Sequence, residues 1–538
     1  MFRAGDIRKS LTSSVFLHLA LILIVFSYVF YRILELELGK VGRLGFAMDD
    51  AWIHMAVARN FLEGKGWGVV PGRALSVSTS PTWTLLVAFF YFIFRDPVTA
   101  ILTLSFLCMV GACILCYFLV HELTENALLG LFACLALIFS PVVLWGMASG
   151  MELPLVLCVL FGTFYLYYSA DADSKVRLYV VPLALAISAI TRPELFVLIP
   201  LALADTFRTL YLKASVERIF AFRRIVIQSL IILVALSPYL LFNKLNGGYL
   251  FPTTYYAKTL IRGVGITAAL KSGDSDAIFE ALIKNPMEQT QDVVDLFLNN
   301  NMVLFFLIMI GFFGFCRATG RTAARRGVLI VAAMLVLPYA MGVSAPSRAM
   351  SNHADRYFII FPAIGVVLAS VGVDLLYRLG RQRIVVALCV LLVLIAPWWT
   401  TYETIKLVIS DVHSTEKMYR PIAEWINENL KPETVLAVND IGVIAYFSKR
   451  DLIDVMGLAS PEIWPAIMRS PGGRINFENM KKYLRERKVE YLLLSPLYYP
   501  ALTNDTNTFE PIKRWKEKYP HGRMISPQIM YKCHWPEP

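Results

Sequence analysis

The chain has few charged residues for its length. Only 17% of its 538 residues are Asp, Glu, Lys or Arg, whereas 57% are hydrophobic; a soluble protein carries about 25% charged residues. Apolar runs of about 20 residues recur along most of the sequence, and each is long enough to cross the roughly 30 Å hydrocarbon core of a bilayer. We therefore predict a polytopic membrane protein. Helices are the expected spanning elements, because the runs are continuous and do not alternate.

Cysteines are also few, and no cleavable signal peptide, internal repeat or low-complexity tract is evident. The eight cysteines lie mostly in or beside apolar runs, and Cys113 and Cys116 are three residues apart on one run. They are predicted as buried apolar residues rather than as a metal site or a disulfide framework. The run from Ser13 to Ile33 is too long for the hydrophobic region of a signal peptide, so it is predicted as an uncleaved first span.

The formal net charge of +11 comes largely from short loops between the apolar runs. Basic residues in such loops set the orientation of a membrane protein, so we predict no nucleic-acid partner. Arg3, Arg8 and Lys9 precede the first span, which places the N-terminus in the cytoplasm.

Eleven spans place every strongly basic loop on the cytoplasmic side. With the N-terminus inside, the loops 35–80 and 243–301 lie outside, and the turn 149–152 lies on the cytoplasmic side, away from Asp49. Pro193 is predicted to kink the sixth span; two short spans there would reverse the side of the loop that follows. The predicted spans are 13–33, 81–94, 97–120, 127–145, 153–168, 179–204, 225–242, 302–315, 328–343, 358–377 and 384–400.

The last quarter of the chain has a different pattern. Residues 1–402 are predicted as the transmembrane domain, and residues 403–538 as a small α/β domain on the outer face. In the latter, Glu416 to Leu430 is typical of an amphipathic helix, whereas 435–438 and Tyr491 to Leu494 are predicted as buried strands.

Two adjacent carboxylates, Asp49 and Asp50, follow the first span and precede a short helical segment, 51–63. Because neighbouring side chains diverge, one can cap the helix while the other points elsewhere. Burial at the membrane edge raises the pKa of a carboxylate toward the strength that a general base needs. Two interpretations stay open here: a catalytic pair, or a cap and a solvated loop residue.

Further polar and aromatic residues are candidates for substrate binding. His54 lies four residues after Asp50, so the carboxylate can orient it, or it is an ordinary interfacial histidine. The cations at 258, 348 and 356 fall on the same outer face as the carboxylates, which favours a site for an anionic lipid-borne substrate; aromatic and basic residues are also common at interfaces. The candidates are His54, Arg59, Trp83, Glu152, Arg192, Tyr255, Tyr256, Lys258, Arg348 and Arg356.

Several short motifs resemble those of the GT-C superfamily of integral-membrane glycosyltransferases, and the likeness is nearest to its arabinofuranosyltransferase-like branch. It runs over nearly the whole chain, and the order and spacing of the motifs carry it. The motifs are Asp49-Asp50-Ala51-Trp52-Ile53, Ala58-Arg59-Asn60, Gly64-Lys65-Gly66, Thr79-Ser80-Pro81-Thr82-Trp83, Ser149-Gly150-Met151-Glu152, Thr191-Arg192-Pro193-Glu194, Pro252-Thr253-Thr254-Tyr255-Tyr256-Ala257-Lys258, Asp355-Arg356-Tyr357, Asn439-Asp440-Ile441-Gly442 and Leu452-Ile453-Asp454-Val455-Met456-Gly457-Leu458.

The resemblance implies the GT-C fold and inverting transfer of a sugar, arabinofuranose in that branch, from a polyprenyl-phosphate donor to a glycan or lipid acceptor. Transfer takes place on the outer face of the cytoplasmic membrane. Asp49 or Asp50 serves as the general base, with Asp49 favoured because Asp50 stands nearer the helix start, and Lys258, Arg348 and Arg356 bind the donor phosphate.

Some members of the superfamily use a divalent metal beside the loop carboxylates, but the sequence fixes no metal ligand. Thr253-Thr254 departs from the expected Pro-Asn-Thr-like run. The alternative function is a transporter or flippase of lipid-linked saccharides, although such proteins often have inverted repeats, which this sequence lacks.

Overall fold

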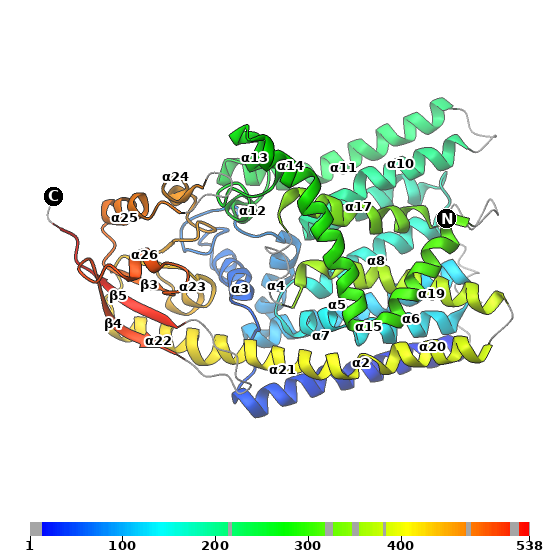
Figure 1. The fold of residues 1–538 in the computed structure, drawn as a ribbon, viewed down its shortest axis with the longest axis horizontal. Coiled ribbons are helices and arrows are strands. Elements are labelled where there is room, and N and C mark those ends of the chain that lie inside the picture. The colour runs from blue at the N-terminus through cyan, green and yellow to red at the C-terminus, as the bar shows by residue number, and fades with distance from the viewer. Residues whose placement is uncertain are drawn as a thin grey trace.

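The computed structural model describes residues 13–212, 218–317, 327–346, 354–379, 383–469, 475–516 and 527–536. A bundle of long helices carries a small sheet domain at one end (Figure 1). We call this end of the bundle the sheet end and the opposite end the far end. The bundle comprises α2 (Ser13–Val41), α5 (Pro97–Thr124), α6 (Ala127–Ile138), α7 (Pro141–Ala148), α8 (Leu153–Ser169), α9 (Val181–Thr191), α10 (Leu198–Tyr211), α11 (Arg218–Gly247), α15 (Asn285–Arg317), α17 (Val328–Ser344), α19 (Ile360–Arg378), α20 (Arg383–Ile395) and α21 (Trp398–Ser414).

Within the described residues, six helices are long and apolar enough to cross a membrane, and a seventh span results if α6 and α7, bent by 66°, count as one. Four apolar helices are shorter: α4 (Pro81–Phe94), α8, α17 and the segment Val176–Thr191 that contains α9. The prediction of a polytopic helical membrane protein is confirmed. The count of eleven spans stays a prediction.

The predicted second span, α4, does not run from one end of the bundle to the other. The helix begins after Ser80, and Thr84 in its first turn forms a hydrogen bond with His54 on α3 (Asp49–Leu62). Near the end of α4, the hydroxyl of Tyr91 lies 3.4 Å from that of Tyr446 in the sheet domain. Both ends of α4 are therefore at the sheet end, beside α3 (Figure 1). A 14-residue helix is also only about 21 Å long, less than the hydrocarbon core of a bilayer.

The predicted sixth span, 179–204, is two antiparallel helices rather than one kinked helix. Asp173, before α9, accepts a hydrogen bond from Arg224 near the start of α11, and Asp205 on α10 accepts one from Tyr167 at the end of α8. Arg192, between α9 and α10, instead contacts Glu152 at the sheet end. The chain therefore turns back at η2 (Pro193–Val197), because Pro193 ends the helix instead of kinking it.

Counting α4 as a span reversed the predicted position of the turn 149–152. The loops between α4 and η2 therefore lie at the opposite end of the bundle from the predicted one, and the additional turn at η2 restores the alternation for the later loops. The structure places Glu152 at the sheet end, 3.8 Å from His54. The expectation that this turn lies away from Asp49 is wrong.

The sheet domain contains a five-stranded mixed sheet with the order β2-β1-β3-β5-β4. Strand β1 is parallel to both β2 and β3, whereas β5 is antiparallel to β3 and β4. The predicted amphipathic helix and the two predicted strands are confirmed. The domain comprises α22 (Arg420–Asn429), β1 (Leu436–Val438), α23 (Gly442–Ser448), β2 (Leu452–Asp454), α24 (Trp464–Ile467), α25 (Phe477–Glu486), β3 (Tyr491–Leu494), α26 (Pro500–Thr503), β4 (Phe509–Trp515) and β5 (Gln528–Cys533).

Shorter elements connect the bundle to this domain. The segment after α11 forms α12 (Thr253–Lys258), α13 (Gly265–Ser272), α14 (Ser275–Phe279) and η3 (Glu280–Lys284) at the sheet end. Single turns or short π segments form η1 (Val176–Val180), η4 (Arg356–Phe358), η5 (Thr415–Tyr419) and η6 (Pro461–Ile463).

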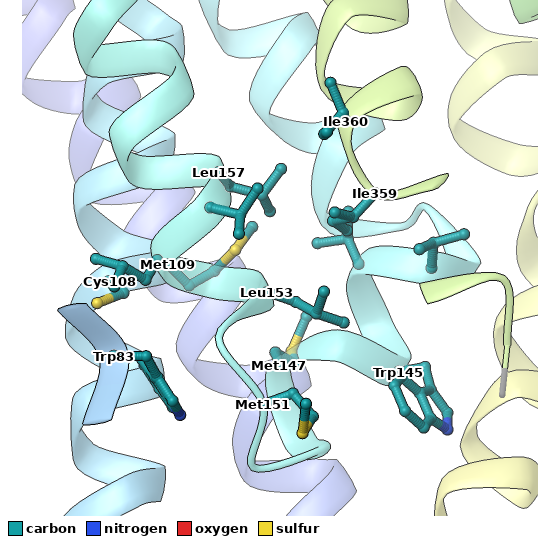
Figure 2. Close-up of a cluster of buried hydrophobic side chains, with 14 of the residues drawn as sticks. Trp83, Cys108, Met109, Trp145, Met147, Met151, Leu153, Leu157, Ile359 and Ile360 are labelled. Atoms are coloured by element: carbon teal, nitrogen blue, oxygen red, sulfur yellow. The ribbon is translucent and has the colours of Figure 1, made fainter. Parts of the chain in front are cut away.

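A large apolar core lies beneath the turn 149–152. Trp83 from α4, Met109 from α5, Trp145 from α7 and Leu153 from α8 are buried there (Figure 2). The core fixes the positions of the helix ends that meet the sheet domain, because close-packed side chains permit little relative movement.

Candidate functional site

A cavity of about 510 Å³ lies between the helix bundle and the sheet domain. Its walls come from α3, the turn 149–152, η2, α12, the end of α17, η4, and the loops after β1 and β2. Seven of the predicted site residues line it: Asp49, Asp50, Glu152, Arg192, Tyr255, Lys258 and Arg356.

Asp50 stands at the first turn of α3 among cationic side chains. Its Oδ2 lies 2.9 Å from Nη2 of Arg356 and 3.8 Å from Nζ of Lys258. The hydroxyl of Tyr357 lies 3.5 Å from the same lysine nitrogen. Burial raises the pKa of this phenol, but Lys258 and Arg356 outweigh it and lower that pKa to about 8. The two cations are therefore placed to bind a negatively charged group.

Asp49 points to the sheet domain. Its carboxylate accepts hydrogen bonds from the backbone amides of Gly442 (2.8 Å) and Val443 (2.7 Å), at the start of α23. Burial and the nearby Asp440 raise the pKa of Asp49 above its ordinary value, although the two amides oppose the shift. One of the two aspartates thus caps a helix, as expected, but this helix is α23 of the sheet domain. Neither side chain caps α3, whose N-cap is Met48.

His54 is held by groups other than Asp50. Its Nδ1 lies 2.7 Å from Oγ1 of Thr84, and its Nε2 lies 3.8 Å from Oε2 of Glu152. Burial lowers the pKa of His54, although the charges of Glu152 and Asp50 oppose the shift. Arg192 donates to Oε1 of Glu152 (2.6 Å) and to Oε2 of Glu194 (3.1 Å), so it pairs with both carboxylates. Burial raises the pKa of Glu152, yet Arg192 and His54 bring it below its ordinary value.

Besides His54, three predicted binding residues lie outside the lining of the cavity. Arg59 donates to the backbone carbonyl of Tyr446 and stacks on its ring, so it joins α3 to α23. Trp83 is fully buried in the apolar core, and Tyr256 packs against Tyr249. Arg348 lies outside the described residues.

Other lining residues were not predicted as site residues. Asn439 and Asp440 come from the loop after β1, and Glu194 and Tyr357 adjoin predicted residues in the chain. All four stand in motifs that carried the family resemblance, which was the available signal. Arg262 also lines the cavity, and no motif indicated it.

Among the described residues, no group of three or more His, Cys, Asp or Glu side chains could hold a metal ion. Asp49 binds two backbone amides and Asp50 binds two side-chain cations. A divalent cation would have to displace these N–H groups from the carboxylate oxygens, so the carboxylates as arranged do not fit the metal that some superfamily members use.

Two family models match parts of the chain. Residues 78–242 match a family described as dolichyl-phosphate-mannose-protein mannosyltransferase, and residues 408–528 match a domain of unknown function, DUF8728. No match is found among curated protein sequences.

Solved structures match nearly the whole chain at low sequence identity. ArnT from Cupriavidus metallidurans bound to undecaprenyl phosphate shares 12% identity at a TM-score of 0.58, over 94% of this chain and 97% of that chain. The apo state of the same protein gives 13% and 0.57 over the same shares. The Archaeoglobus fulgidus oligosaccharyltransferase in complex with Zn and sulfate gives 14% and 0.55, over 95% and 73%. The chain therefore shares the fold of these proteins over nearly its whole length, and residues 78–242 also match the mannosyltransferase family model.

Proposed function

We propose that the protein transfers a sugar from a polyprenyl-phosphate donor to a glycan or lipid acceptor in this cavity, with inversion and with Asp50 as the general base. The ArnT structure contains undecaprenyl phosphate, which supports a lipid-phosphate donor for this fold. Arabinofuranose is the first donor sugar to test, because the sequence motifs resemble that branch most. The protein would act in the cytoplasmic membrane, with residues 403–538 on the extracytoplasmic side.

The single observation that carries this proposal is the contact of Asp50 with Arg356 and Lys258 in the wall of the cavity. A carboxylate and two cations on one cavity wall match the two requirements of the reaction. The base takes a proton from the acceptor hydroxyl, and the cations stabilise the phosphate that leaves.

Asp50 fits the role of base better than Asp49, which the sequence favoured. Both carboxylate oxygens of Asp49 accept backbone hydrogen bonds from the start of α23, so protonation of Asp49 would weaken this helix cap. A donor phosphate that binds Lys258 and Arg356 competes with Asp50 for these cations. The cations then stabilise the charge of Asp50 less, and Asp50 becomes a stronger base.

No second carboxyl group is needed as an acid in this mechanism. A glycosidase protonates a poor leaving group with one carboxylic acid. A lipid phosphate leaves as a stable anion, and fixed cations in a low-dielectric cavity stabilise it further. Lys258, Arg356 and the Tyr357 hydroxyl lie together and supply these contacts.

The test is a comparison of Asp50→Asn and Asp49→Asn in the purified full-length protein, with labelled polyprenyl-phosphate sugars and an envelope glycan fraction as acceptor. We expect Asp50→Asn to lower kcat by about 10²-fold or more, because general base catalysis contributes about 10²–10⁴-fold. Asp49→Asn should lower activity less and weaken the attachment of the sheet domain. Asp276→Asn, on α14 outside the cavity lining, is the matched control.

Full transfer by Asp50→Asn would show that this carboxylate is not the base. The transporter alternative predicts a different result: movement of a lipid-linked saccharide across vesicles without any glycosidic bond being formed. Transfer by the wild-type protein in detergent, where no compartments exist, contradicts that alternative.

A further inference from the structure

We infer that the sheet domain is the acceptor-binding part of the enzyme, with Asp440 as the residue that binds an acceptor sugar hydroxyl. This inference rests on the proposed function and assigns a role to a region that matches only a domain of unknown function.

The topology of the sheet supports a ligand site at the end of β1. In open α/β sheets, ligands bind outside the carboxyl ends of parallel strands, where the connections from neighbouring strands diverge. The connection after β1 leads to β2 on one side, and β3 pairs on the other side of β1. The residues that follow β1 are Asn439 and Asp440, and both line the cavity.

Other contacts hold this edge of the sheet in place. The side chain of Asn439 accepts a hydrogen bond from the backbone amide of Ser495, after β3, at 3.1 Å. Asp454, at the end of β2, accepts bonds from the amides of Met456 and Leu458, and both of these residues line the cavity. The Asn439 bond therefore joins the ends of β1 and β3, and the Asp454 bonds fix the loop after β2 at the cavity wall.

Asp440 is held in a way that leaves capacity for a ligand. Its Oδ2 accepts bonds from the Tyr419 hydroxyl (2.7 Å), Nδ2 of Asn439 (2.6 Å) and Nε2 of Gln528 (3.1 Å). In the described part of the chain, each of its hydrogen bonds goes to this oxygen, so the three donors fix the side chain while Oδ1 can accept a further bond. A carboxylate oxygen held in this way is a preorganised acceptor for a hydroxyl group.

The bundle side and the sheet-domain side of the cavity carry different charges, so they suit different substrates. The cations Lys258 and Arg356 come from α12 and η4, on the bundle side. On that side the lining also includes the apolar residues Phe196, Val197 and Met341 from η2 and α17. Asp440 faces the same cavity from the sheet domain with negative charge, which repels a phosphate and suits a sugar hydroxyl. Asp50, on α3, contacts both cations and lines the same cavity as Asp440.

The experiment measures the KM values of both substrates for Asp440→Asn in the full-length protein. The acceptor probe is the envelope glycan fraction extracted from cells that lack the gene, titrated at saturating labelled donor. We expect the acceptor KM to rise about tenfold or more, which is the loss of a hydrogen bond to a charged group, with the donor KM changed less than about twofold. Tyr419→Phe removes one of the three donors to Asp440 and should raise the acceptor KM by a smaller factor.

Glu478→Gln is the matched control, since this carboxylate belongs to the same domain and its side chain is 84% exposed. An unchanged acceptor KM in Asp440→Asn, or an equal rise of both KM values, would overturn the inference. The outcome is separate from that of the proposed function: loss of transfer in Asp50→Asn with no effect of Asp440→Asn would reject only the acceptor site. Should Asp440→Asn unfold, Tyr419→Phe decides by the same comparison of KM values.

Discussion

Oδ2 of Asp49 lies 2.8 Å from the backbone nitrogen of Gly442, 393 residues later in the chain. A Cβ atom added at Gly442 would overlap the backbone carbonyl of Asp49, so the two helices α3 and α23 are in direct backbone contact. Arg59 adds a bond to the carbonyl of Tyr446. The position of the neighbouring Asp50 therefore depends on how the sheet domain packs against α3.

Gly442→Ala should separate α3 from α23 and lower the transfer rate by about tenfold or more, because small displacements of catalytic groups cost about 10²-fold. The helix bundle should still fold, since it buries its own core. Transfer assays and helical circular dichroism measure the two effects. Gly39→Ala is the control, as nothing lies within 4 Å of a Cβ at that position. Wild-type activity in Gly442→Ala would contradict the tight packing of the two helices.

Lys258→Gln should raise the donor KM about tenfold and leave the acceptor KM unchanged. The lysine lies 3.8 Å from Asp50 and lines the cavity, and its loss removes a charge-assisted bond to the donor phosphate. Lys271→Gln, on the exposed surface of the nearby α13, should leave both constants unchanged. Equal donor KM values in the two variants would show that Lys258 does not bind the donor.

Tyr357 should ionise at about pH 8 in the folded protein, because Lys258 and Arg356 lower its pKa despite burial. The ultraviolet absorbance of phenolate measures this titration, and Tyr357→Phe should abolish the step. The folded-state pKa lies below the unfolded value of about 10, so ionisation favours the folded state. This stabilisation is present above about pH 10 and is lost as the pH falls through about 8. A titration with no phenolate formed below pH 9 or so would contradict the placement of the cations.

Trp83→Phe should leave both KM values unchanged, because Trp83 packs in the apolar core and does not line the cavity (Figure 2). Its buried Nε1 has no hydrogen-bond partner among the described residues, so phenylalanine removes an unsatisfied donor while keeping an aromatic ring. Trp83→Ala, by contrast, should lower the free energy of unfolding by about 3–5 kcal/mol through the cavity it leaves. Thermal unfolding and steady-state kinetics test the pair. A raised donor KM in Trp83→Phe would show that Trp83 contributes to donor binding.

Hydropathy located the apolar helices but could not decide which of them cross the bundle. The segment 81–94 is as apolar as a span, yet α4 lies beside α3 with Leu85, Phe89 and Phe92 exposed on one face. A helix that lies in the interface and a helix that crosses it have the same composition when both bury one face and expose the other to lipid. For the segment 179–204, hydropathy could not distinguish one kinked helix from two helices, because a proline can kink a helix or end it.

The candidate site was found in large part because its charges are scarce in an apolar sequence. Asp50, Lys258 and Arg356 stood out as ionisable residues near predicted span ends, and they meet in one cavity. Asp440 did not stand out, because the sheet domain contains many carboxylates. The role of Asp49 was also beyond the sequence, since its partners are backbone amides, which every residue except proline provides.

The sequence by itself determined that this is a polytopic helical membrane protein with a small α/β domain, because burial of apolar runs depends on local composition and period. It also singled out Asp50, Lys258 and Arg356, which line one cavity. Only the tertiary structure decided that Glu152 meets His54, that Asp49 caps α23, and that Asp440 shares a cavity with Asp50. These contacts join elements up to almost 400 residues apart, and their free energy depends on how helices and sheet pack rather than on any local pattern.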